Sequence, residues 1–156
     1  MPAKGAFYIK KTLQLGKLEK FLNEAVALLK PGGRLYLLEG HPSLMQIDEK
    51  AEGLRIGFDW RNEPDKPLTM SEETTYTGDT AKIAHPVTHE WLHPISDVAN
   101  AMIDAGLTIE RLNEHERLAW QFAPWMVPVE GRRRMWVLPE GLPKMPVAYS
   151  LQARKP

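Results

Sequence analysis

Three residues in the middle of the chain have the spacing of a zinc site. His89, Glu90 and His93 match H-E-x-x-H, in which histidines one helical turn apart share a face and the glutamate serves as general base. Pro94 follows directly and disfavours helical geometry at His93, so the segment favours a strand. In a strand the two histidines lie about 13 Å apart, at roughly 3.3 Å per residue, which is too far for one metal ion. A zinc hydrolase therefore ranks below a strand or pocket wall without metal.

A second set of polar residues lies at the carboxyl end of a predicted strand over residues 34–39. Glu39 and His41 come at its carboxyl end, and ligands of open α/β sheets bind beyond that end. The two are candidate pocket residues, and a solvated strand end is the alternative. Trp120, with Phe122 and Trp125, either walls a substrate pocket or fills the core, and the size of these rings favours the core.

The composition argues against several classes of protein but does not indicate a function. The 156 residues carry 20 basic and 20 acidic side chains, which does not favour a nucleic-acid or membrane-surface binder. There is no cysteine, hence no disulfide or thiolate zinc site. Arg132, Arg133 and Arg134 are interpreted as a solvated loop. No apolar run approaches a membrane span, and we expect a cytoplasmic protein.

The first 41 residues predict a βαβ unit. An apolar strand over 5–9 precedes a helix whose apolar residues recur with a 3.6-residue period and which ends at the Lys30-Pro31-Gly32-Gly33 turn. The buried stripe of this helix is predicted to comprise Leu18, Phe21, Leu22, Ala25, Leu28 and Leu29. The unbroken apolarity of the strand over 34–39 indicates burial on both faces, as in a parallel sheet.

The rest of the chain is expected to complete a single domain over 1–156, in which 42–94 is an excursion and 95–156 a helix followed by an antiparallel strand pair. Within the excursion, 70–76 and 81–92 are predicted strands around Thr77-Gly78-Asp79. Ser96 is the expected N-cap of a helix that ends at Gly106, with Asp97 in its first turn and Leu107 in contact behind it. Strands are predicted over 108–112 and 147–153, separated by a long loop over 113–145.

Three segments together resemble the C-terminal part of class I S-adenosylmethionine-dependent methyltransferases. Residues 28–39 (LLKPGGRLYLLE) are similar to the stretch leading through the fifth strand of that family. Residues 97–107, ending Ala-Gly-Leu, resemble the helix before its sixth strand, and 146–156 resemble its closing antiparallel strand. Residues 76–92, together with His93, are similar to a substrate cover in the small-molecule branch.

The resemblance implies an α/β fold with a partial Rossmann-like sheet of strand order 4-5-7-6, in which the seventh strand is inserted antiparallel between the fifth and the sixth. A lid-like excursion accompanies this sheet. It also implies S-adenosylmethionine as cofactor and methyl transfer to a small molecule, with Glu39, His41, Glu90, Trp91, His93 and Trp120 as pocket candidates. The sequence contains no G-x-G-x-x-G loop to receive that cofactor. We therefore expect impaired activity, and the alternative is a noncatalytic binding or dimerisation protein.

The same resemblance leaves the strand over 5–9 at an open edge. An apolar edge strand is normally covered, because its unpaired backbone groups attract another strand. We expect a homodimer through this edge.

Overall fold

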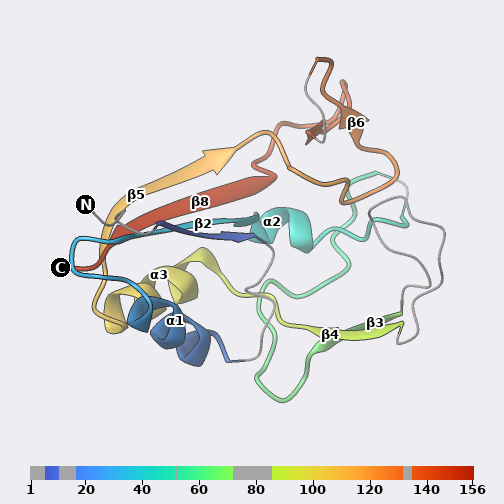
Figure 1. Ribbon diagram of the computed structural model, residues 1–156. Coiled ribbons are helices and arrows are strands. Elements are labelled where there is room, and N and C mark those ends of the chain that lie inside the picture. The colour runs from blue at the N-terminus through green and yellow to red at the C-terminus, as the bar shows by residue number, and fades with distance from the viewer. Residues whose placement is uncertain (1–5, 11–16, 52, 72–85, 132–134) are drawn as a thin grey trace.

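A four-stranded sheet forms the centre of the molecule (Figure 1). The computed structural model describes residues 6–10, 17–51, 53–71, 86–131 and 135–156. The strand order is β1-β2-β8-β5, with bounds β1 Ala6–Lys10, β2 Arg34–Gly40, β8 Ala148–Arg154 and β5 Thr108–His115. β1 pairs parallel to β2, and β8 lies antiparallel between β2 and β5. This arrangement confirms the predicted partial sheet with an inserted antiparallel last strand.

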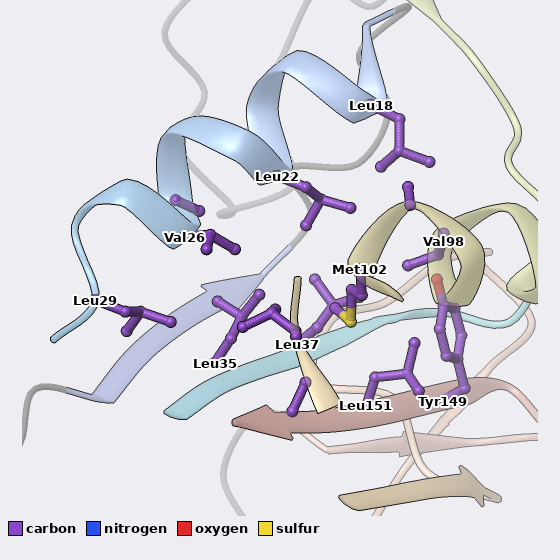
Figure 2. Packing of buried hydrophobic residues seen from close by; sticks show 14 residues of the cluster. Leu18, Leu22, Val26, Leu29, Leu35, Leu37, Val98, Met102, Tyr149 and Leu151 are labelled. Carbon is purple, nitrogen blue, oxygen red and sulfur yellow. The ribbon is translucent and has the colours of Figure 1, made fainter. Parts of the chain in front are cut away.

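Two helices cover one face of the sheet (Figure 1). α1 spans Leu18–Ala27 and α3 spans Ile95–Asp104. Leu22 of α1 and Val98 of α3 meet Leu35, Leu37 and Leu151 of the strands, and all five side chains are fully buried (Figure 2). Burial of each such side chain stabilises the fold by about 1.5–3 kcal/mol. The larger of the two buried clusters lies between these helices and the sheet.

The end of α1 differs from the predicted stripe. Leu28 follows the last helical residue and is 66% exposed, whereas Val26, which the prediction left out, is buried. The ammonium group of Lys155 donates to the carbonyl oxygens of Val26 at 3.0 Å and Leu29 at 2.9 Å. A lysine from the far end of the chain therefore binds the carbonyl end of α1, where cations are favourable.

The sequence predicted the end of α3 correctly and its start incorrectly. The predicted N-cap at Ser96 is wrong, because the helix starts at Ile95 and Pro94 precedes it, although Asp97 does lie in the first turn. The predicted end is confirmed. Gly106 has φ +85°, its N–H donates to the carbonyl of Ile103, and the N–H of the buried Leu107 donates to Met102.

β2 is not equally buried on its two faces. Leu35, Leu37 and Glu39 are buried, whereas Tyr36 and Leu38 are half-buried, so the expectation of burial on both faces is wrong in part. The reason is that the second face turns polar toward the start of β2. There the carboxylate of Glu110 accepts hydrogen bonds from Nε of Arg34 at 3.0 Å and Nε of Arg154 at 3.1 Å.

The excursion begins with a short helix, α2, over Pro42–Met45, and contains a separate two-stranded sheet of β3 (Leu68–Ser71) and β4 (Val87–Glu90). The strands begin and end elsewhere than predicted, and the turn at 77–79 lies outside the described residues. Arg61 ties the excursion to α3 through an ion pair with Asp97 at 2.6 Å. The N–H of Leu92 donates to the side-chain oxygen of Asn62 at 2.8 Å.

The stretch predicted as one loop over 113–145 contains more structure. β5 continues to His115, and backbone hydrogen bonds join Leu118 and Trp136 in both directions. β6 (Val127–Pro128) pairs with β7 (Trp136–Val137). The prediction failed because these pairings are short and join residues distant in sequence. The arginines at 132–134 lie outside the described residues.

Candidate functional site at the carboxyl edge of the sheet

Three polar side chains lie in one row where β2 and β5 end. Glu39 of β2 stands opposite Tyr149 of β8, and Tyr149 stands opposite Glu114 of β5. Residues opposite each other in antiparallel strands share a face, so all three belong to the face covered by the helices. The row therefore places two carboxylates on either side of a phenol at the edge where ligands of such sheets bind.

His41 connects this row to the excursion. Its backbone is extended and caps α2: the N–H of Ser43 donates to Nδ1 at 3.1 Å. Nε2 must then carry the proton, and it lies 3.0 Å from Oε1 of Glu114. Both ring nitrogens are occupied, so His41 in this arrangement positions Glu114 and α2 and offers no free nitrogen to a substrate.

Tyr149 is almost completely buried, at 2% exposure, beside the helices (Figure 2). Burial raises the pKa of its hydroxyl well above the usual value of 10.0, and the negative charge of Glu39 raises it further. The imidazole of His41 approaches edge-on, with 6.3 Å between ring centres. The phenol therefore stays neutral at physiological pH and remains a hydrogen-bond donor.

Glu39 is 6% exposed and His41 is 7% exposed, so the alternative interpretation of a solvated strand end does not hold. A buried carboxylate at a strand end is costly unless it is hydrogen-bonded or paired, and such groups often mark functional sites. The structure thus brings together two of the six predicted pocket residues, Glu39 and His41.

Trp120 lies on the opposite face of the sheet, in a cluster rich in tryptophan and methionine. It is 6% exposed, and a Cβ at Gly40 would lie 2.7 Å from Cε of Met45 and 3.3 Å from Trp120. We call this set the Trp–Met cluster. Its buried residues are Leu44, Leu118, Trp120, Ala123, Met126, Val147 and Ala148, and those packed against them include Phe122, Trp125 and Trp136. The core interpretation of Trp120 fits this packing.

Glu90, Trp91 and His93 lie on β4 and just after it, in the separate small sheet. The indole nitrogen of Trp91 donates to the carbonyl of Pro64 at 3.1 Å, and this hydrogen bond joins two parts of the excursion. His89 lies opposite Thr69, whose hydroxyl is 3.0 Å from its Nδ1. Because His89 and Glu90 are in a strand, the helical spacing of a zinc hydrolase does not occur. The residues that the structure describes contain no group of three acidic, histidine or cysteine side chains able to hold a metal ion.

Two members of the row, Tyr149 and Glu114, were missed from the sequence. Neither has a local motif, and each becomes part of the site only through strand register. The predicted strand order and the antiparallel insertion of 147–153 place these strands side by side. They do not fix the register, which decides which residues stand opposite one another.

No protein-family model matches the sequence, and no curated protein matches it. Solved structures do resemble the fold. One is a protein provisionally assigned as an S-adenosylmethionine-dependent methyltransferase from Listeria monocytogenes, with a TM-score of 0.57 at 12% identity, over 97% of this chain and 61% of that one. Another is an S-adenosylmethionine-dependent methyltransferase from Mesorhizobium loti, with a TM-score of 0.54 at 16% identity, over 99% of this chain and 64% of that one.

The strand order and these likenesses define a class I methyltransferase-like fold. The chain spans about three fifths of the length of the two solved structures. None of the helices that the structure describes is long and apolar enough to cross a membrane.

Proposed function

We propose that this chain forms the acceptor side of an S-adenosylmethionine-dependent methyltransferase, whose reaction transfers a methyl group to a small molecule. The observation that supports this most is the row of Glu39, Tyr149 and Glu114 at the carboxyl edge of a methyltransferase-like sheet. A small molecule bound there would meet the buried carboxylate of Glu39 and a neutral phenol, beside the exposed carboxylate of Glu114.

The chemistry of the row suits an acceptor that must be oriented and, where needed, deprotonated. Methyl transfer gains most from alignment of the acceptor atom, and a base helps only when that atom must lose a proton. His41 has both nitrogens engaged. In this proposal the carboxylate of Glu39 acts as the base, while the hydroxyl of Tyr149 orients the acceptor as a donor.

The residues of this chain do not by themselves fit S-adenosylmethionine. The sequence has no glycine-rich loop of the G-x-G-x-x-G type. We accordingly propose that the chain alone transfers no methyl group.

The absence of the loop motif favours a second candidate, a noncatalytic small-molecule-binding protein built on this fold. Both candidates use the same edge, and both give Glu90, Trp91 and His93 of the excursion the role of a cover over the bound molecule. Arg61 supports that role, since its ion pair with Asp97 joins the excursion to the first turn of α3.

The acceptor site is tested by mapping ligand binding on isotope-labelled chain by NMR. The probes are small molecules that each carry one hydroxyl, amine or thiol nucleophile. We expect shifts at residues 39–41, 114 and 149, and at least tenfold weaker binding in Glu39→Gln. Glu110→Gln, a carboxylate near the opposite end of the same sheet, is the matched control and should bind as the unmodified chain does. Binding that maps elsewhere, or equal loss in both variants, would overturn the proposal.

A further inference from the structure

The two edges of the central sheet differ in how well they resist pairing with another strand. The sheet ends with β1 on one side and β5 on the other. Edge strands present unpaired N–H and C=O groups, and proteins protect them with charges, bulges or a covering segment. The β5 edge carries such protection, and the β1 edge carries less of it.

The β5 edge carries two such protections. Its register shifts between Ile109 and Arg111, which marks a bulge, and six of its eight residues are exposed. Glu110, Arg111 and Glu114 place charges along it. A further strand would meet an irregular, charged backbone there.

The β1 edge has neither. All five residues pair with β2 in unbroken register, from Ala6 opposite Arg34 to Lys10 opposite Leu38. The sequence Ala-Phe-Tyr-Ile-Lys carries a single charge, at its end. Among the described residues no strand pairs with the other side of β1. A regular, mainly apolar strand with no second partner among the residues that the structure describes has the features that favour strand addition.

We propose that β1 pairs with β1 of a second copy of this chain. A two-fold axis normal to the sheet brings the two free sides together antiparallel, so that each strand supplies the partner that the other lacks. The sheets then join into one of eight strands, four from each copy, with α1 and α3 of both copies on the same face. The second copy has the same sequence and brings no glycine-rich loop, so the dimer covers the edge without completing a cofactor site.

The first test is the mass of the full chain by sedimentation equilibrium over about 1–200 μM. We expect twice the chain mass of 17.8 kDa. A monomer throughout this range would overturn the proposal, including the case in which the chain pairs only with a different polypeptide.

The second test locates the contact. Successive N–H groups of a strand point to opposite neighbours, so one of Phe7→Pro and Tyr8→Pro removes a bond to β2 and the other removes a bond across the two-fold axis. We expect one of them to remain folded by circular dichroism while its dimer dissociation constant rises at least tenfold. Asn113→Lys, on the β5 edge, is the matched control and should leave the dimer unchanged.

Hydrogen exchange keeps the proposal testable if both proline variants unfold. In the unmodified chain, amides of residues 6–10 should exchange more slowly as the concentration rises through the dimer range. A dimer whose formation slows exchange in β5 and not in β1 would contradict the proposal.

Discussion

Oε1 of Glu114 lies 3.0 Å from Nε2 of His41, so the end of β5 is joined to the residue that follows β2. The same imidazole accepts the N–H of Ser43 and begins α2. One buried ring therefore ties two strands and a helix together at the edge that we assign to the acceptor.

Replacement of His41 separates its two roles. His41→Ala should lower the free energy of unfolding by about 1–2 kcal/mol, because the cap of α2 and the bond to Glu114 are both lost. His41→Asn should recover part of that loss, since asparagine is a good N-cap. Urea unfolding measures both, and equal stability of the alanine variant and the unmodified chain would contradict the structure.

Lys155 should stabilise the chain through the carbonyl end of α1. Lys155→Met removes two hydrogen bonds and a charge at that end, and should cost about 1 kcal/mol in urea unfolding. Lys144, whose side chain is 87% exposed and 3.9 Å from Glu116, is the matched control. Lys144→Met should change stability by less than about 0.5 kcal/mol, and an equal effect of the two would refute the role of Lys155.

Glu110 should make stability depend on acid pH. The hydrogen bond from Arg34, then that from Gln152, holds the pKa of Glu110 below its ordinary value of 4.5. A lowered folded-state pKa stabilises the chain above the ordinary value, and the contribution is lost as pH falls through the folded-state pKa. Between neutral pH and about pH 3, Glu110→Gln should therefore lose less stability than the unmodified chain. An identical acid profile for the two would show that the interaction is absent.

Tyr149 should have the opposite effect at alkaline pH. Its raised pKa means that the hydroxyl ionises more readily in the unfolded chain, near 10.0, than in the folded one. That contribution is complete below 10.0 and is lost as pH rises above it. Tyr149→Phe should flatten the loss of stability between about pH 9 and pH 11, measured by urea unfolding at each pH. A steeper profile in the variant would contradict the burial of this hydroxyl.

The sequence predicted those parts of the fold that depend on neighbouring residues. The helix period in α1 and the turn at Gly106 and Leu107 are local patterns, and the structure confirms them. The strand order of the sheet was implied by the family resemblance, and the structure confirms it as well. The start of α3 is also local, but two signals competed: Pro94, two residues before Ser96, takes the N-cap position, so the helix already begins at Ile95. Proline at that place starts the helix early.

The parts that escaped prediction depend on distant residues. Lys155 supplies the cation at the end of α1, because the chain after the last strand pairs with the turn that follows that helix. Glu39 and His41 were recognised from their place after a strand. Tyr149 and Glu114 join them only through the register of β8, which no pattern in the sequence fixes.

We propose that these residues supply the acceptor side of the fold and not the cofactor side. Calorimetric titration of the chain with S-adenosylmethionine and with S-adenosylhomocysteine tests it most directly. We predict no saturable heat with either compound at millimolar concentration. Saturable binding of one molecule per chain would contradict the account, since it would require a complete cofactor pocket within these residues.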